Sequence, residues 1–525
     1  MPEIKTFEFN KNKVQQIKDS HFGLNWPVVY LIEDGKELYV GETTSAYTRT
    51  NQHLENPERK KLDKIHVITD EEYNKSATLD IESKLIQYIS ADGKFILQNS
   101  NHGIKNHDYF DRQKYQAKFE MIWKELQKMN IAANDRIQIE NSDLFKYSPY
   151  KALTVDQKII VDELVEEIKS GKYRSYIING DPGTGKTVLA TYLFKRLKEI
   201  KETKDLKIGL VVPMTGLRGT LKKIFKNIKN LKSNMVIGPS GVTQKYDILI
   251  IDEAHRLKQR KNITNFRSFD DNNKLLGLDR NSTELDWIMK CSKCQILFYD
   301  KNQSVRPSDV PQSKFENLSI KKYRLNSQLR ISSGMDGERY IKLIQDLFNL
   351  ENIEYNNFVN YDFKIYDDLS QMVKDIKEKN KDMELCRMIS GYAWPWISKK
   401  DPNKYDIEVG DVKLKWNSVN NNWVYSKNAI DEVGCIHTVQ GYDLNYAGVI
   451  IGPEISYDFN KNKFKIYPEK YMDINGRRGV SDIKELERYI INIYKTLLTR
   501  GIHGTYLYIV DENLRKYFME KIYNI

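Results

Sequence analysis

A glycine-rich turn between an apolar run and an amphipathic run constrains the fold of this chain more than any other feature. The segment "SYIINGDPGTGKTVLATYLFKRL" (175–197) reads as a strand, a turn and a helix, and it fits the pattern G-x-x-x-x-G-K-[ST]. Glycines let the backbone curl so that its N–H groups and the next helix N-terminus face phosphate oxygens. The segment therefore predicts an α/β domain with a phosphate-binding loop.

The residues of this turn are the expected nucleotide ligands. They are Gly180, Asp181, Pro182, Gly183, Thr184, Gly185, Lys186 and Thr187. Lys186 is expected to reach the β- and γ-phosphates, and the Thr187 hydroxyl to hold Mg²⁺. ATP with Mg²⁺ is therefore the predicted cofactor.

A second apolar run, "YDILIIDEAHRL" (246–257), ends in two acids. Asp252 at the tip of the predicted strand is expected to hold the Mg²⁺ through water. Glu253 is expected to orient the attacking water as general base. The alternative is a strand followed by an acidic helix cap, and the phosphate-binding loop upstream favours hydrolysis.

Length and charge bound the function. A chain of 525 residues is too long for one core and predicts two to four domains. The formal net charge of +11 indicates a nucleic-acid partner, although a Lys-, Asn- and Ile-rich bias gives the same number. No stretch approaches about eighteen uncharged apolar residues, and the start has no apolar signal core. We therefore expect a cytoplasmic protein with no membrane partner.

The four cysteines do not predict a metal centre. Cys291 and Cys294 in "CSKC" have the spacing of metal ligands. No second cysteine or histidine pair completes a tetrahedral zinc site in the sequence. Reduced cysteines near a core strand are the favoured reading.

Together, "GDPGTGKT" and "DEAH" resemble the motifs of superfamily 1 helicases, and further motifs follow the order of that family. In "LTVDQKIIVDEL" (153–164), Gln157 matches the glutamine that reads adenine. In "ILFYDKNQSV" (296–305), Gln303 matches the residue that senses the γ-phosphate. The resemblance implies two RecA-like lobes with ATP bound at the first.

Two other segments resemble the nucleic-acid motifs of the same family. "GLVVPMTGLRGTLKKIF" (209–225) resembles the strand–turn segment that touches a nucleic-acid backbone. "GCIHTVQGYDLNYAGVII" (434–451) resembles the fifth motif, in which Thr438, Gln440 and Gly441 couple nucleic acid to nucleotide. The resemblance implies nucleic acid as a partner, with DNA favoured.

Two arginines match those that the second lobe supplies in the family. Arg330 lies in "LNSQLRIS" and Arg500 in "YKTLLTRGIHGTYLYIV". An arginine that reaches the transferred phosphoryl group from another lobe can be worth about 10³–10⁵ in rate. Taken singly, each would be read more often as a surface ion pair. The segments "GYAWPW" and "LLTRGIHGT" are most similar to the Schlafen-like group of these helicases.

The amino-terminal region carries a separate pattern. "PVVYLIEDGKELYVGE" (27–42) reads as two short strands joined through an Asp-Gly turn, with Tyr30 and Tyr39 on partner strands. The next segment can be helical, which places Arg49 and His53 on one face. A later predicted helix carries Glu82 beside its apolar stripe, an unusual position for a lone carboxylate.

This pattern resembles a GIY-YIG nuclease over residues 26–102, with Val-Val-Tyr and Tyr-Val-Gly as the two triplets and a valine at position 28 where the family commonly has glycine. The resemblance implies that Glu82 holds Mg²⁺ or Mn²⁺ against the scissile phosphate. Tyr30, helped by Tyr39 or His53, is expected to take a proton from the attacking water. Arg49 is expected to neutralise the phosphate, and Asn99 to fix substrate or strand geometry.

The predicted fold class is α/β, with a small mixed α/β nuclease domain followed by two RecA-like P-loop lobes. The predicted boundaries are 1–110 for the nuclease domain, which opens with a polar lead-in helix over 1–25, and 111–150 for a helical connector. The lobes are expected at 151–315 and 316–525.

The second lobe is interrupted by polar segments at 398–430 and 453–485. The favoured reading of both segments is solvated loops. The alternative is a nucleic-acid-contacting subdomain that uses Trp416, Trp423 and Tyr425 as stacking surfaces.

The favoured function is an ATP-dependent nucleic-acid translocase or helicase coupled to a metal-dependent endonuclease that cuts foreign (phage) DNA in bacterial defence. DNA repair and mobile-element processing would use the same residues. The competing reading is an ATP-gated nuclease switch without translocation. A non-catalytic binding platform is disfavoured because Glu82, Lys186 and Glu253 are all present. A homo-oligomer or a partner defence protein remains open.

Overall fold

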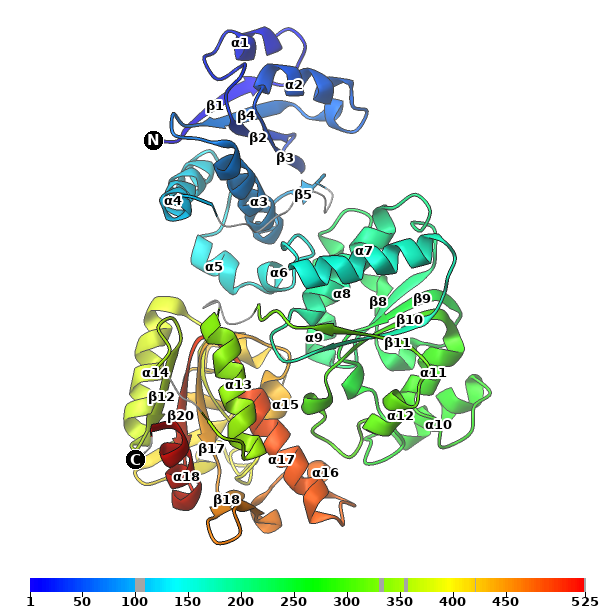
Figure 1. Ribbon diagram of the computed structural model, residues 1–525, viewed down its shortest axis with the longest axis vertical. Helices are drawn as coiled ribbons and strands as arrows, with labels where there is room; N and C mark the ends of the chain where they lie inside the picture. The colour runs from blue at the N-terminus through cyan, green and yellow to red at the C-terminus, as the bar shows by residue number, and fades with distance from the viewer. Residues whose placement is uncertain (100–108, 330–334, 354–356, 421, 524–525) are drawn as a thin grey trace. The chain divides into compact units, whose positions relative to one another are not determined.

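The computed structural model describes residues 1–99, 109–329, 335–353, 357–420 and 422–523 (Figure 1). Its chain forms two compact units. The first unit contains residues 1–172, 187–205 and 220–236. The second unit contains residues 173–186, 206–219 and 237–525. The protein is an α/β protein with one small mixed sheet and two larger, mainly parallel sheets.

The first unit holds the small sheet, in the order β1-β4-β2-β3-β5 (Figure 1). The strands are β1 (Glu3–Glu8), β2 (Val28–Glu33), β3 (Glu37–Thr43), β4 (Lys64–Thr69) and β5 (Ile96–Leu97). The pairings β1–β4, β2–β4 and β2–β3 are antiparallel, and β3–β5 is parallel. The expected hairpin is present, with Tyr30 of β2 opposite Gly41 of β3.

The expected polar lead-in helix over residues 1–25 is wrong in its first part. Residues 3–8 form β1, which pairs with β4 from Glu3 opposite Thr69 to Glu8 opposite Lys64. Only the five-residue helix α1 (Val14–Lys18) follows. The free edge of β4 supplies backbone partners that the charged sequence of β1 does not reveal.

The helices of the first unit include the long α3 and α4, which pack together. The full set is α1, α2 (Ala46–Glu55), η1 (Arg59–Lys61), α3 (Lys75–Asp92), α4 (Arg112–Lys128), α5 (Arg136–Asn141), α6 (Asp143–Lys146) and α7 (Val155–Lys169). The rings of Phe119 and Trp123 on α4 lie 5.1 and 5.6 Å from the ring of Tyr88 on α3. Two aromatic residues of the predicted helical connector are therefore used for packing against α3.

A six-stranded sheet is built around the phosphate-binding strand, in the order β11-β6-β10-β9-β7-β8. Its strands are β6 (Ser175–Gly180), β7 (Ile208–Val211), β8 (Val236–Ile237), β9 (Tyr246–Ile251), β10 (Ser292–Tyr299) and β11 (Lys321–Leu325). Strands β6, β9 and β10 are parallel neighbours, so their carboxyl ends meet at one edge. Ligands of open α/β sheets bind outside this edge.

The helical segments that accompany this part of the chain are mostly short. They are α8 (Lys186–Glu199), α9 (Thr215–Lys226), η2 (Ser233–Met235), η3 (Pro239–Gly241), η4 (Ala254–Arg256), α10 (Phe266–Leu275), α11 (Glu284–Cys291), η5 (Lys301–Gln303) and α12 (Gln312–Glu316). Helix α8 begins directly at the lysine of the phosphate-binding loop, as the sequence predicts.

The second large sheet has seven strands in the order β12-β20-β17-β13-β16-β15-β14, parallel except for the β14–β15 pair. The strands are β12 (Asp362–Tyr366), β13 (Cys386–Ser390), β14 (Ile407–Val409), β15 (Val412–Trp416), β16 (Glu432–Cys435), β17 (Leu444–Ile451) and β20 (Gly501–Ile509). Around it are α13 (Met335–Asn349), α14 (Leu369–Met383), η6 (Trp423–Tyr425), α15 (Ile436–Val439), η7 (Pro468–Lys470), α16 (Ile474–Arg477), α17 (Ile483–Leu498) and α18 (Glu512–Tyr523).

The polar segments expected as solvated loops carry regular structure. Residues 398–430 contain β14, β15 and η6, and residues 453–485 contain the antiparallel pair β18 (Ile455–Asp458) and β19 (Lys463–Ile466). Trp416 and Trp423 are buried, and the Trp423 indole donates to Glu432 at 2.7 Å. Both rings belong to the core, which rules them out as surfaces for stacking bases.

Within the described residues, all four cysteines are buried and none forms a disulfide, and no group of three or more His, Cys, Asp or Glu side chains is placed to hold a metal ion. The "CSKC" pair therefore does not form a tetrahedral site with other side chains of the described chain. None of the helices in the same residues is both long and apolar enough to cross a membrane.

Candidate functional site

Tyr30 and His53 form the centre of a buried cluster in the first unit. The Tyr30 hydroxyl of β2 lies 2.7 Å from Nε2 of His53 on α2. A Cβ atom at Gly41 would lie 2.3 Å from the Tyr30 hydroxyl oxygen. The tyrosine ring therefore lies across position 41, and only glycine fits beneath it.

Tyr39 completes the cluster from the partner strand. Its ring centroid lies 5.0 Å from that of His53 and 6.3 Å from that of Tyr30. The guanidinium of Arg59, in the turn η1, stacks on the Tyr39 ring at 3.8 Å. Arg59 also donates to Nδ1 of His53 at 2.9 Å. Sequence reasoning missed Arg59 because no spacing rule selects it.

Arg49 faces the two tyrosines. Burial alone lowers its pKa, but hydrogen bonds and charge from Tyr30 and Tyr39 raise the pKa overall. Burial, together with the charges of Arg59 and Arg49, lowers the pKa of His53 to about 3. The imidazole is therefore neutral at physiological pH.

Glu82 lies on α3 next to a second carboxylate, that of Glu42. Burial and the charge of Glu42 together raise the pKa of Glu82 to about 7, although the charges of Lys75 and Arg49 lower it in part. The Glu42 carboxylate accepts hydrogen bonds from Lys75 at 2.5 and 2.6 Å and from Thr78 at 3.4 Å. Sequence reasoning missed Glu42, although it directly follows the Tyr-Val-Gly triplet.

This donor set fits a divalent cation of the Mg²⁺ type. Such a cation keeps several waters and is bound by one or two carboxylates plus substrate phosphates. Glu82 and Glu42 supply two carboxylates whose mutual repulsion disfavours full ionisation. A cation beside them would remove that repulsion.

Asn99 is placed on the backbone of the second triplet. Its amide oxygen accepts from Val40 N–H at 2.9 Å, and its amide nitrogen donates to Val40 C=O at 2.8 Å. Of the two roles predicted for Asn99, this arrangement serves strand geometry.

The phosphate-binding loop has the backbone that its sequence predicts. Gly183 and Gly185 have φ of +86° and +76°, a backbone conformation that residues with a side chain rarely adopt. The buried Lys186 ammonium donates to the carbonyls of Gly180 at 2.8 Å and Asp181 at 3.2 Å. It also lies 3.5 Å from the Asp300 carboxylate at the end of β10. A cation is thus fixed among backbone groups at the carboxyl edge of the sheet.

Asp252 and Glu253 follow β9 at the same edge, and both are buried. Glu253 has φ of +52°, a conformation uncommon for residues other than glycine. Its carboxylate lies 2.8 Å from Nε2 of His255. Burial raises the pKa of Glu253, but His255, Lys186 and Arg500 outweigh burial and lower it below its ordinary value. The predicted general base is therefore ionised.

Gln303 and Arg500 meet within the second unit. The Gln303 amide donates to Asp300 at 2.7 Å, and its oxygen accepts from the buried Arg500 at 3.4 Å. Arg500 also donates to the carbonyl of Tyr442 at 3.3 Å. The two predicted residues therefore share one polar cluster with Glu253.

The other predicted nucleotide residues are placed as follows. Gln157 is buried, and its side-chain oxygen accepts from the N–H of Thr154 in a capping box at the start of α7. Arg330 lies outside the described residues. Gln328, just before it, donates to the carbonyl of Pro182 at 2.8 Å, a contact that no spacing rule predicts. The adenine role of Gln157 remains a prediction.

A pocket of about 260 Å³ in the second unit is lined by residues of both predicted nucleic-acid motifs. They include Pro213, Met214, Thr215, Gly216 and Leu217 from the first motif, and His437, Thr438, Gln440 and Tyr442 from the second. Three cations missed from sequence, Arg256, Lys258 and Arg306, line it as well. The sequence could have indicated these three cations, because Arg256 and Lys258 closely follow the acidic motif and Arg306 closely follows the γ-phosphate motif. The positive charge of these side chains suits a phosphate backbone.

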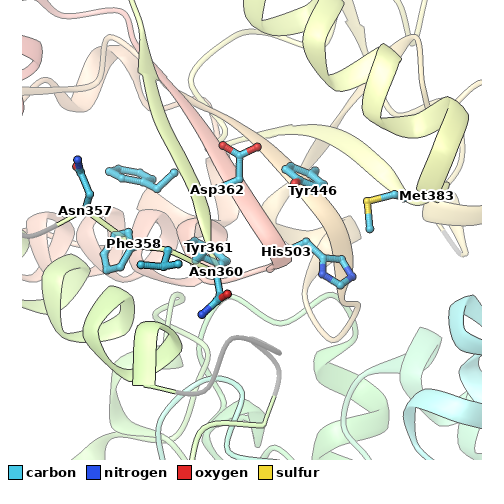
Figure 2. A pocket seen from close by; sticks show the side chains of 10 residues that line it. Asn357, Phe358, Asn360, Tyr361, Asp362, Met383, Tyr446 and His503 are labelled. Atoms are coloured by element: carbon cyan, nitrogen blue, oxygen red, sulfur yellow. The ribbon is translucent and has the colours of Figure 1, made fainter. Parts of the chain in front are cut away.

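A second cavity of the same unit, about 590 Å³, contains none of the predicted residues. Figure 2 shows Asp362, Tyr446 and His503, which lie near the amino ends of β12, β17 and β20, beside Phe358 and Asn360. Because the three strands are parallel, this cavity lies at the edge opposite their carboxyl ends.

Comparison with known proteins identifies the larger part of the chain. Residues 174–511 match the family described as Schlafen group 3, DNA/RNA helicase domain. Uncharacterized protein YPL245W of Saccharomyces cerevisiae (strain ATCC 204508 / S288c) is 29% identical over 389 residues, which cover 65% of this chain and 83% of that protein.

Solved Pif1 helicases are also similar. The Bacteroides protein, in complex with ADP-AlF3 and ssDNA, is 12% identical at a TM-score of 0.28, covering 70% of this chain and 94% of that chain. The Candida albicans protein is 10% identical at a TM-score of 0.28, covering 70% of this chain and 99% of that chain. The family match confirms the resemblance that the helicase motifs predicted. Because this match spans more than half of the sequence, the chain belongs to the Schlafen group 3 DNA/RNA helicase-domain family.

Proposed function

We propose that this protein couples ATP-driven movement along nucleic acid to metal-dependent cleavage by an amino-terminal GIY-YIG nuclease, with foreign DNA such as phage genomes as its target. The observation that carries the nuclease is the convergence of Tyr30, Tyr39, Arg49 and His53 on one buried cluster. These residues come from two strands and a helix. Packing alone does not require two tyrosines, a histidine and an arginine to share polar contacts.

Each of these side chains has a role in phosphodiester cleavage. The Tyr30 oxygen, as the phenolate formed when its own proton passes to solvent, would receive a proton from the attacking water. Arg49 supplies fixed positive charge for the phosphate in the transition state. Glu82, with Glu42 beside it, would hold the divalent cation. That cation, when bound, polarises the scissile phosphate and lowers the pKa of a coordinated water.

The ATPase half rests on the polar cluster at the carboxyl edge of the six-stranded sheet. Lys186 is held for the β- and γ-phosphates, and the ionised Glu253 for the attacking water. Thr187 and Asp252 would hold the Mg²⁺ that neutralises the phosphate oxygens. Arg500 brings positive charge to the same cluster. Family membership supports this half of the proposal independently.

Circular, linear and single-stranded DNA, each incubated with the full chain and Mg²⁺ in the presence or absence of ATP, tests the proposal. We expect nicking that Glu82→Gln reduces at least about 100-fold while ATP hydrolysis persists. We expect Lys186→Ala to abolish hydrolysis and strand displacement while local nicking persists. Nicking that survives both Glu82→Gln and EDTA would show that the metal-nuclease assignment is wrong.

A second function, an ATP-gated nuclease that does not translocate, is favoured by one contact inside the first unit. Lys195 lies on α8, the helix that begins at the phosphate-binding loop, and its buried ammonium donates to the carbonyl of Asn99 at 3.4 Å. It is also paired with Glu199 and lies 4.6 Å from the ring of Tyr150. A shift of α8 on nucleotide binding would therefore reach the segment that holds the second triplet.

Lys195→Met separates the two functions, with Lys198→Met on the same helix as the matched control. In a switch, the wild type nicks at a rate that ATP changes and never displaces a labelled strand. Lys195→Met would then nick at one rate with or without ATP. In a motor, the wild type displaces the strand and Lys195→Met retains ATP-dependent displacement.

A further inference from the structure

Arg59 is a cation that contacts His53 and that the nuclease pattern does not include. It lies in η1, six residues after the histidine, and donates to Nδ1 at 2.9 Å. Its guanidinium also stacks on the ring of Tyr39 at 3.8 Å, which fixes its plane. Arg59 is therefore held by two residues of the predicted site at once.

The chemistry of guanidinium decides the state of the imidazole. Arginine carries five N–H donors, no acceptor, and a charge that it keeps at all physiological pH values. A nitrogen that faces it must accept through a lone pair. Nδ1 of His53 therefore carries no proton, and the neutral ring has its single proton on Nε2.

Nε2 is the nitrogen that faces Tyr30, at 2.7 Å from the hydroxyl oxygen. With the proton on Nε2, the histidine donates and the tyrosine oxygen accepts. Burial raises the pKa of Tyr30, and the nearby positive charge of Arg49 counters part of that rise. The Tyr30 oxygen thus receives one N–H donor and lies near one positive charge, and both favour developing negative charge on it.

We propose that Arg59 is a positioning residue that fixes His53 as the Nε2–H tautomer, so that the histidine donates to the Tyr30 oxygen and does not take its proton. The consequence for cleavage rests on the proposed nuclease function. The assignment of the tautomer does not rest on that function, because the tautomer is a property of the folded chain. Of the two helpers expected for Tyr30, His53 then acts as a hydrogen-bond donor.

The groups around the imidazole agree with this assignment. Tyr30 of β2 and Tyr39 of β3 pack on the ring, Arg59 of η1 faces Nδ1, and Arg49 lies on the same helix as His53. Both charges are positive, and burial removes the ring from water, so protonation is opposed from every side.

Nitrogen-15 NMR of the imidazoles tests the proposal in the full chain, with His53→Gln used to assign the signal among the eight histidines. We expect an Nε2–H, bare Nδ1 pattern for His53 that does not change between about pH 5 and 8. Arg59→Met should give a mixed tautomer or a titration inside that range. Lys61→Met, an exposed residue of the same turn, should leave the wild-type pattern unchanged.

Two results would overturn the proposal: an Nδ1–H pattern in the wild type, or a pattern that Arg59→Met leaves unchanged. If Arg59→Met does not fold, the tautomer measured in the wild type is by itself the test of the proposal. In the nicking assay, Arg59→Met should lower the rate at least about tenfold and introduce a pH dependence between about pH 5 and 8. A wild type that does not nick would refute the proposed function and leave the tautomer result standing.

Discussion

The side chain of Asn99 pairs with the backbone of Val40 as a further strand would, accepting its N–H at 2.9 Å and donating to its carbonyl at 2.8 Å. Val40 lies between Tyr39, whose ring contacts His53, and Gly41, which lies under the ring of Tyr30. The asparagine therefore holds the middle of the triplet from outside the hairpin. It controls where both tyrosines stand without touching either.

Asn99→Asp should impair the nuclease more than Asn99→Ala. Aspartate still accepts from the Val40 N–H, but its second oxygen would face the Val40 carbonyl, whereas alanine leaves both groups unpaired. Loss of these buried hydrogen bonds should cost about 1–3 kcal/mol of unfolding free energy in either variant. Nicking rates and chemical denaturation, with the neighbouring Gln98→Ala as control, measure both effects. Equal nicking by Asn99→Asp and wild type would contradict this role.

The amino-terminal hairpin and the phosphate-binding loop could be predicted because their geometry is local. A strand–turn–helix with glycines at fixed offsets requires a particular backbone, and Gly183 and Gly185 adopt the positive φ that it needs. The hairpin predicted that Tyr30 and Tyr39 lie on partner strands, and helical spacing placed Arg49 and His53 on one face. The meeting of Tyr30 and His53 was implied only by the resemblance to GIY-YIG nucleases. In these places the chain's own neighbours determine the structure.

The remainder depends on partners distant in sequence. Residues 3–8 form a strand because they pair with the edge of β4 that β2 leaves open, and the sequence of residues 1–25 does not show this edge. Trp416 and Trp423 lie in segments rich in lysine and asparagine, but both are buried. Trp416 lies on β15, which pairs with β16, and the Trp423 indole donates to Glu432 of β16. Arg59 reaches His53 across a turn of irregular geometry. Composition and periodicity do not encode such contacts.

Lys258→Ala should weaken single-stranded nucleic-acid binding uniformly across sequences. Lys258 is exposed and lines the pocket that both predicted nucleic-acid motifs share. A lysine that contacts a phosphate releases about one counterion, so the slope of log affinity against log salt should fall by about one. Fluorescence anisotropy between about 50 and 200 mM salt measures it. The exposed Lys290→Ala, outside the pocket, serves as control, and an unchanged slope would remove Lys258 from the interface.

Arg500→Lys should slow ATP hydrolysis much more than it weakens nucleotide binding. Lysine keeps the charge but lacks the planar fork that contacts Gln303 and the Tyr442 carbonyl together. A misplaced arginine of this kind costs up to about 10³-fold in rate. Steady-state hydrolysis and binding of a fluorescent ATP analogue separate the two effects, with the exposed Arg488→Lys as control. A change confined to binding would assign Arg500 to nucleotide affinity.

Glu454→Gln should stabilise the protein at alkaline pH and leave its stability unchanged at acid pH. Glu454 is buried, and one carboxylate oxygen accepts from the Tyr494 hydroxyl at 2.5 Å. The other oxygen, also buried, has no hydrogen-bond partner among the described residues. Burial raises the pKa of this carboxyl to about 7, and Tyr494 lowers it only in part.

The direction of the effect follows from the two pKa values. Below about pH 4 the carboxyl is protonated in both the folded and the unfolded chain, so it imposes no penalty. As the pH rises to 7 and beyond, the unfolded chain loses its proton first and the folded chain must ionise a buried group. The wild type therefore loses up to about 3 kcal/mol across this window. The amide of Glu454→Gln does not ionise and should avoid that loss.

Thermal unfolding of the full chain at about pH 3.5 and pH 8.5 measures the difference. We expect the two proteins to unfold together at the lower pH and Glu454→Gln to unfold at the higher temperature at the upper pH. The exposed Glu469→Gln should give the same small difference at both values. A Glu454→Gln effect that does not change with pH would mean that the carboxyl is already ionised in the fold, with its second oxygen reached by water.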